Sequence, residues 1–322
     1  MGSTTLLFVS RAPTRDSGSN TVRRDGDLMN DNLRGSLFMM GSMATFTLND
    51  ATVKYLAQGM PTFQVVFLRG VAATVLIALL AYVTGALRRP IPRRDWPWVL
   101  GRSALEVISF LPFILALTHM PLANVTAILQ ALPLTITAAG ALFLGERVGW
   151  RRWTAILVGL IGVLLIVRPG GEDFNLWSVS AVVAVFAVTA RDLVTRKLSP
   201  EVPSLKVAVI TAAGVTILGL ALSVRTPWQP FEVGQGGLIL LASAFVLGGY
   251  LFSIMAMRVG EIGVVTPFRY TALIWGILLG WAVFSEFPKP LTLIGAALVA
   301  GTGLYTLLRE GRAPVPRPVG PR

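Results

Sequence analysis

The chain has 322 residues, of which 54% are hydrophobic and only 14% charged, and its mean hydropathy is +0.69. A soluble globular protein carries about 25% charged residues, so this composition excludes a chain whose whole surface faces water. The sequence has no cysteine and one histidine, His119, which excludes disulfides, thiolate metal sites and histidine-based triads. The net charge of +12 comes from short basic clusters between long apolar runs, which is typical of a membrane protein and not of a nucleic-acid-binding face.

A transmembrane helix needs about 20 mostly apolar residues. In chain order, the sequence predicts about ten such helices, at 36–57, 62–86, 97–118, 121–144, 152–168, 176–197, 204–223, 236–257, 262–284 and 291–308. These runs are too long for barrel strands and lack their alternation of polar and apolar residues. The predicted fold class is therefore an all-α membrane protein.

Two polar tails, 1–34 and 309–322, are expected to be disordered and cytoplasmic. The side of the membrane follows from Lys and Arg, because cytoplasmic loops carry an excess of both. With a cytoplasmic N-terminus, the outer side receives only Arg168, Arg225 and Lys289 from the loops. The sequence thus predicts a multi-pass protein of the cell inner membrane with both termini in the cytoplasm.

The segment 48–65 reappears weakly at 190–207, which indicates an internal repeat. At one constant offset, the matching residues are Asp50 and Asp192, Lys54 and Arg196, Pro61 and Pro203, and, further on, Thr74 and Thr216. The sequence LFLGE at 142–146 is echoed by WAVFSE at 281–286. Each half, 35–169 and 176–308, holds five predicted helices, so the second half enters the membrane in the opposite sense. Inverted repeats of this kind surround a midplane site in many secondary transporters.

Four segments resemble the drug/metabolite transporter superfamily and, within it, tandem EamA-type proteins. They are LNDATVKYLA at 48–57, FQVVFLRG at 63–70, ANVTAILQALP at 123–133 and GERVGWRRW at 145–153. The resemblance covers about residues 33–308 and implies ten helices, cytoplasmic termini, no cofactor and transport of small organic solutes. The segments at 49–54 and 191–198 are most similar to S-adenosylmethionine uptake carriers and to bacterial riboflavin transporters of that superfamily.

Charged residues within predicted helices need partners or water, because a charge at membrane depth costs roughly 2.5–3.5 kcal/mol. Asp50 and Lys54 lie four residues apart on one helix face, and Asp192 and Arg196 repeat that spacing. One interpretation is that the two pairs are outer and inner gates; the other is that they are interfacial salt bridges. Arg69 lies at the depth of Asp50 on the next helix, as a ligand for an anionic substrate group or as a buried counter-ion.

Glu106 is the acidic residue nearest the middle of the third predicted helix, with Arg102 one turn away. A carboxylate there can couple transport to protons, or it can form a packed intrahelical pair with Arg102. The sequence does not decide between these two interpretations.

The fourth and ninth predicted helices carry prolines among polar side chains, and a proline inside a membrane helix frees a backbone carbonyl. We expect these faces to line a substrate path, although they can also be polar contacts between helices. The predicted path residues are Asn49, Asp50, Arg69, Glu106, Thr126, Gln130, Tyr250, Thr266, Arg269, Tyr270 and Trp275.

The predicted function is that of a secondary carrier of a small organic metabolite, such as riboflavin or S-adenosylmethionine, with no cofactor and no metal. Proton or ion coupling and a homodimer are both compatible with the sequence. Alternatives are an exporter of amino acids or drugs, and a membrane enzyme that modifies lipids. The enzyme would need clustered acidic ligands or a nucleophile with a base, and the nearest acidic cluster, Glu172 and Asp173, has no such partners.

Overall fold

The computed structural model describes residues 25–310 except 147, 170–174, 225 and 231, and within that part of the chain it is helical with no strand. The first half consists of α1 (Asp25–Gly59), α2 (Thr62–Val83), η1 (Ala86–Arg88), η2 (Arg93–Asp95), α3 (Trp96–His119), α4 (Leu122–Leu129), α5 (Leu132–Phe143) and α6 (Trp150–Val167). The second half consists of α7 (Leu176–Thr195), α8 (Ser204–Ser223), α9 (Val233–Val259), α10 (Ile262–Val265), η3 (Thr266–Tyr270), α11 (Thr271–Phe284) and α12 (Pro290–Glu310).

The predicted membrane-spanning helices are confirmed. Nine segments of the described chain are long and apolar enough to cross a membrane, and α1, with 35 residues, is a further long helix of the bundle. Large apolar side chains such as Leu79, Phe186 and Ile217 are 58%, 59% and 66% exposed, as expected where lipid replaces water. Residues 25–34, predicted to belong to a disordered tail, form the first turns of α1; the predicted tails at 1–24 and 311–322 lie outside the described residues.

Proline interrupts two helices at corresponding places in the halves. The fourth span is broken at Gln130 and Ala131, between α4 and α5, and Pro133 begins the second part. The ninth span passes through the 3₁₀ turn η3, which contains Pro267. Proline has no N–H to donate and its ring clashes with the preceding turn, so a helix breaks just before it. The broken spans are a further match between the two repeats.

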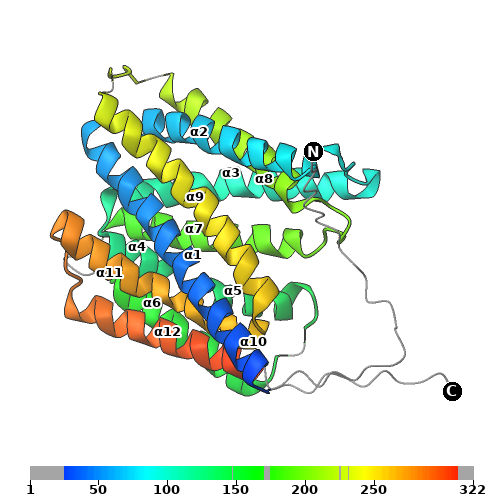
Figure 1. Ribbon diagram of the computed structural model, residues 1–322. Helices are drawn as coiled ribbons and strands as arrows, with labels where there is room; N and C mark the ends of the chain where they lie inside the picture. The colour runs from blue at the N-terminus through cyan, green and yellow to red at the C-terminus, as the bar shows by residue number, and fades with distance from the viewer. Residues whose placement is uncertain (1–24, 147, 170–174, 225, 231, 311–322) are drawn as a thin grey trace.

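Helix contacts between the halves follow a two-fold pattern (Figure 1). Helix α1 packs along α9, and its counterpart α7 packs along α3, the counterpart of α9. Helices α2 and α8 are counterparts that pack on each other, as are α6 and α12. Exchanging the two halves therefore turns the α1–α9 contact into the α7–α3 contact and leaves the α2–α8 and α6–α12 contacts unchanged. Two inverted five-helix repeats require this pattern.

The α2–α8 crossing brings matched residues of the repeats together. The hydroxyl oxygens of Thr74 and Thr216 lie 3.1 Å apart and share a hydrogen bond, although 142 residues separate them in the chain. Two equivalent residues touch only where they lie on the symmetry axis that relates them. The pseudo-two-fold axis thus passes through this crossing.

Both described chain ends, at Asp25 and Glu310, lie at one end of the bundle (Figure 1). We call this end the terminal face. The other end, where α1 finishes at Gly59, is called the opposite face.

Glycine lets α6 and α12 approach closely. A Cβ atom on Gly295 would lie 2.5 Å from the carbonyl oxygen of Gly162, and a Cβ atom on Gly162 would lie 2.7 Å from that of Gly295. Gly301, on the same helix α12, has open space around it. Small residues allow such backbone contact between membrane helices.

Gly295→Ala is therefore expected to destabilise the protein by roughly 1–3 kcal/mol, because the added methyl overpacks the crossing. Gly301→Ala makes the same change without a clash and is expected to keep or slightly raise the melting temperature. Thermal unfolding of the purified protein in detergent measures both. Equal melting temperatures for the two variants would show that the crossing is not tightly packed.

Candidate functional site

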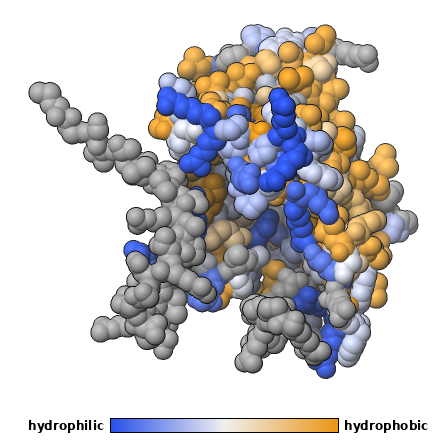
Figure 2. Space-filling view, turned by 90° about the vertical axis from the view of Figure 1, so that its right-hand side faces the viewer, coloured by the Kyte–Doolittle hydropathy of each residue, from blue (hydrophilic) through white to orange (hydrophobic). Residues whose placement is uncertain are grey.

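A cavity of about 680 Å³ lies among α1, α2, α3, α7, α8 and α9. Its lining includes Ser199, Pro200 and Val202 from the connection after α7, so it reaches the terminal face. Figure 2 shows hydrophilic side chains gathered around a hollow on the face from which the chain ends leave. A pocket of this size suits a small organic molecule, since ligand pockets usually measure about 300–1,000 Å³.

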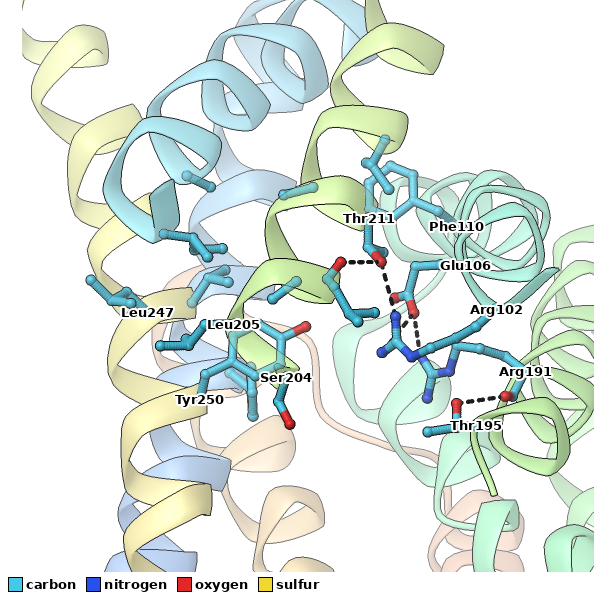
Figure 3. A pocket seen from close by; sticks show the side chains of 18 of the residues that line it. Arg102, Glu106, Phe110, Arg191, Thr195, Ser204, Leu205, Thr211, Leu247 and Tyr250 are labelled. Carbon is cyan, nitrogen blue, oxygen red and sulfur yellow. Dashed lines mark hydrogen bonds and ion pairs between the residues drawn. The ribbon is translucent and has the colours of Figure 1, made fainter. Parts of the chain in front are cut away.

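One wall of the cavity carries a cluster of charges in which each group has a partner (Figure 3). Arg191 donates to Glu106 Oε2 at 2.8 Å and to Asp192 Oδ1 at 2.7 Å. Arg102 donates to Thr211 Oγ1 at 2.9 Å, and its Nη2 lies 3.9 Å from Glu106 Oε2. The interhelical pair between α7 and α3 is therefore closer than the predicted intrahelical pair of Arg102 and Glu106.

A second polar group lies on α1 and α2, deeper in the cavity. Asn49 donates from Nδ2 to Asp50 Oδ1 at 2.9 Å, and Arg69 lies near enough to Asp50 to interact with it electrostatically. Within the described chain, the buried atoms Asn49 Oδ1 and Arg69 Nε have no hydrogen-bond partner. Tyr250 and Leu247 on α9 stand across the cavity from the Arg191 cluster (Figure 3).

An ion pair joins segments of the bundle at the opposite face, beyond the cavity lining. Lys54 Nζ lies 2.9 and 2.8 Å from the two carboxylate oxygens of Glu286 and donates to the backbone oxygen of Met120 at 2.6 Å. The backbone N–H of Leu122 donates to Glu286 Oε2 at 3.1 Å. The Lys54 side chain is only 5% exposed, and these contacts hold together α1, the α3–α4 connection and the segment that follows α11.

The matching ion pair lies at the terminal face. Arg196 Nη1 lies 2.6 Å from Glu146 Oε1, and these side chains are 44% and 45% exposed. Arg196 is the repeat counterpart of Lys54, and Glu146 ends the fourth span as Glu286 ends the ninth. The two pairs are thus equivalent in position, but Lys54 and Glu286 are only 5% and 30% exposed, less than Arg196 and Glu146.

Loop contacts follow the same equivalence. At the start of α2, Gln64 donates to the backbone oxygen of Gln229 at 2.6 Å and accepts from its N–H at 3.0 Å. At the start of α8, Lys206 donates to the backbone oxygens of Leu87 and Arg89 at 3.2 and 3.0 Å. Each half thus ties the beginning of its second helix to a loop of the other half.

The predicted pairing of Asp50 with Lys54, and of Asp192 with Arg196, is wrong. Lys54 pairs with Glu286, Arg196 with Glu146, and Asp192 with Arg191. A four-residue spacing permits contact on a helix but adds only about 0.2–0.5 kcal/mol. Lys54 instead takes the partners that supply two carboxylate oxygens and a carbonyl.

Five of the predicted path residues line the cavity. They are Asn49, Asp50, Arg69, Glu106 and Tyr250. The other six, on the fourth and ninth spans, do not line this cavity: Thr126, Gln130, Thr266, Arg269, Tyr270 and Trp275.

Two residues of this second group, Gln130 and Thr126, contact the other broken span. Gln130 donates from Nε2 to the backbone oxygen of Arg269 at 3.3 Å, which joins the two helix breaks. A Cβ atom on Gly276 of α11 would lie 2.8 Å from Thr126 Oγ1, so α4 and α11 pack closely there. A role of these residues in a substrate path stays a prediction.

Sequence reasoning missed Arg191 and the two glutamates Glu146 and Glu286. Arg191 falls within the helix predicted at 176–197, and the structure shows that it lies in α7 and lines the cavity. The similarity of LFLGE at 142–146 to WAVFSE at 281–286 makes Glu146 and Glu286 repeat counterparts, as Lys54 and Arg196 are. The sequence therefore already indicated a candidate equivalent partner for each of these two basic residues. Glu172 and Asp173 lie outside the described residues.

Comparison with known proteins identifies relatives over most of the chain. The model of the EamA-like transporter family matches residues 33–168 and 175–308. The riboflavin transporter of Vibrio cholerae is 30% identical, over 83% of this chain and 90% of its own length. The pseudopaline exporter CntI of Pseudomonas aeruginosa is 29% identical over 82% and 93%, and the S-adenosylmethionine uptake transporter of Rickettsia conorii is 26% identical over 88% and 97%.

A solved crystal structure shares the fold, with a TM-score of 0.59 and 19% identity over 89% of this chain and 100% of its own. The predicted superfamily, the tandem repeat and the function class are confirmed by these matches. This chain belongs to the EamA-like transporter family, as a multi-pass membrane protein that transports small organic molecules.

Proposed function

We propose that this chain is a secondary transporter that moves a small organic metabolite across the cytoplasmic membrane by alternating access, without enzymatic activity. The observation that carries the proposal is a charged cavity that reaches the terminal face, with no residue of the Lys54–Glu286 ion pair at the opposite face in its lining. The excess of Lys and Arg in the loops on the terminal face supports a cytoplasmic location of that face and of both chain termini. The described conformation is then the inward-open one.

In this proposal the two equivalent ion pairs are the gates. Lys54 and Glu286 close the outer gate, and Arg196 with Glu146 forms the inner gate, which stands open. Exchange between two near-equivalent packings of inverted repeats reverses the roles of the pairs. The same two conformations serve uptake and export, so the imposed gradient sets the direction.

The relatives supply the candidate substrates, which are riboflavin, S-adenosylmethionine and pseudopaline. All are organic metabolites of the size class for which a pocket of about 680 Å³ is suited. The residues that line the cavity all come from one chain, which supports transport by a single copy. Coupling to protons is assigned to Glu106, which faces the cavity.

The direct test is transport by the purified protein in liposomes. Labelled riboflavin and S-adenosylmethionine are offered with and without an imposed proton gradient, and protein-free liposomes are the control. We expect saturable accumulation of at least one compound that a gradient enhances. Chemical conversion of a compound without translocation would contradict the proposal and favour an enzyme.

The gates can be tested by thiol labelling, because the natural chain has no cysteine. Ala212→Cys places one thiol in the cavity wall on α8. We expect a membrane-impermeant maleimide to label it several-fold faster from the cytoplasmic side than from outside. Adding Lys54→Gln opens the outer gate and is expected to raise labelling from outside, whereas adding Arg196→Gln is not. Unchanged sidedness with Lys54→Gln would remove the outer gate from the mechanism.

Glu106→Gln tests proton coupling. The change keeps the shape of the side chain but removes the only protonatable group at that position, so transport is expected to lose most of its dependence on pH. Glu201→Gln is the matched control, since that side chain is 67% exposed and pairs with Arg94 at the surface. Transport rates between pH 5.5 and 8 measure the effect, with protein yield checked by size-exclusion chromatography. Wild-type pH dependence in Glu106→Gln would exclude this residue from coupling.

A further inference from the structure

The cavity contains two groups of polar side chains, and only one of them has its arginine paired with carboxylates of the protein. On the α3–α7 wall, Arg191 is neutralised by Glu106 at 2.8 Å and Asp192 at 2.7 Å. On the α1–α2 wall, no carboxylate oxygen of the described chain lies within 4.0 Å of the Arg69 guanidinium. The Nε atom of Arg69 is buried without a hydrogen-bond partner. The first group is complete within the protein, and the second is not.

The two groups occupy equivalent places in the repeats. The offset of 142 residues that relates Thr74 to Thr216 also relates Asn49 and Asp50 to Arg191 and Asp192. In both groups the first side chain donates to the carboxylate of the second, at 2.9 Å from Asn49 and 2.7 Å from Arg191. The local arrangement is thus the same on both walls.

What differs is the helix that faces each group. Aligning α3 with α9 at their last residues matches Ser103, which contacts Thr211 at 3.1 Å, with Ser243, which donates to the backbone oxygen of Arg69 at 3.1 Å. The repeat offset likewise matches Thr211 with Arg69. The two serine contacts are therefore counterparts, which confirms the alignment of the facing helices.

In that alignment α3 supplies charges that α9 lacks. Arg102 and Glu106 of α3 correspond to Ala242 and Val246 of α9. The Arg191 group therefore receives a counter-ion from its facing helix, whereas α9 has no charged side chain at the two positions that correspond to Arg102 and Glu106. An ionised group in a low-dielectric site without a close partner is costly, and a ligand that supplies the partner recovers that cost.

We infer that Arg69, Asp50 and Asn49 form the binding site for the α-amino carboxylate head group of the substrate. The planar guanidinium of Arg69 matches a carboxylate through two parallel hydrogen bonds. Asp50 and the free Asn49 Oδ1 are acceptors for the ammonium group. This inference rests on the proposed transport function and names its substrate class, which is amphoteric metabolites with an amino-acid head.

Aromatic side chains next to the head-group site accommodate the rest of the substrate. Phe46 and Tyr250 line the cavity and pack edge to face, with ring centroids 5.4 Å apart. Phe110, the repeat counterpart of Tyr250, lines the opposite wall near Arg102 (Figure 3). Such faces suit a flat ring or an aliphatic chain attached to the head group.

Thermal stabilisation of the purified full-length protein in detergent tests the head-group site. The probes are S-adenosylmethionine and the standard L-amino acids, compared with 5′-methylthioadenosine, which keeps the nucleoside but lacks the amino-acid head, and with riboflavin. We expect at least one amino-acid probe to raise the melting temperature in a concentration-dependent way, and 5′-methylthioadenosine and riboflavin to leave it unchanged. Equal stabilisation by 5′-methylthioadenosine or riboflavin, or no stabilisation by any amino-acid probe, would overturn the inference.

Variants then locate the site. Arg69→Gln and Asp50→Asn are each expected to weaken binding of the stabilising probe about tenfold or more, since each removes a charged hydrogen-bond partner. Arg94→Gln removes a charge of the same sign from a side chain that is 68% exposed and outside the cavity, and it is expected to leave the affinity within about threefold of wild type. The melting temperature without probe shows whether each variant folds. Equal affinities in Arg69→Gln and wild type would overturn the site, while transport of riboflavin in liposomes would leave the proposed function standing.

Discussion

The ammonium group of Lys54 has to be neutralised where it lies, because its side chain is only 5% exposed. Burying a charge without a partner costs several kcal/mol, so the surrounding residues must supply oxygen atoms. The carboxylate of Glu286, just after α11, and the backbone carbonyl of Met120, just after α3, do so. The opposite face of the bundle therefore depends on one charge that holds α1 and the segments after α3 and α11 together.

The two halves share a backbone arrangement but differ in charge. The contact of Thr74 with its counterpart Thr216 lies on the axis that relates the halves, between α2 and α8. The facing helices α3 and α9 differ at the positions of Arg102 and Glu106, which are Ala242 and Val246 in the second half. Symmetry of packing thus permits two conformations, and asymmetry of charge gives the cavity one complete and one incomplete polar group.

The sequence was sufficient for the fold because hydropathy, proline and basic residues act locally. Long apolar runs indicate the membrane spans directly. Pro133 and Pro267 indicate the helix breaks, because proline has no backbone N–H to donate. Contact partners are a different matter, because they are chosen among residues far apart in the chain. Lys54 and Asp50 are close in sequence, yet Glu286 is the better partner, since both of its oxygens reach Nζ. Only the repeat echo of Glu146 and Glu286 carried that information.

The exposure of the two ion pairs explains how alternation can be nearly balanced in free energy. In the proposed mechanism, opening the opposite face would bring Lys54 and Glu286 into water, which recovers their hydration and loses their contact. Closing the terminal face would take Arg196 and Glu146, now 44% and 45% exposed, out of water at a similar cost. Because the losses at one end are offset by equivalent changes at the other, the two states can differ by only a few kcal/mol. Differential binding of a substrate is then enough to shift the population between them.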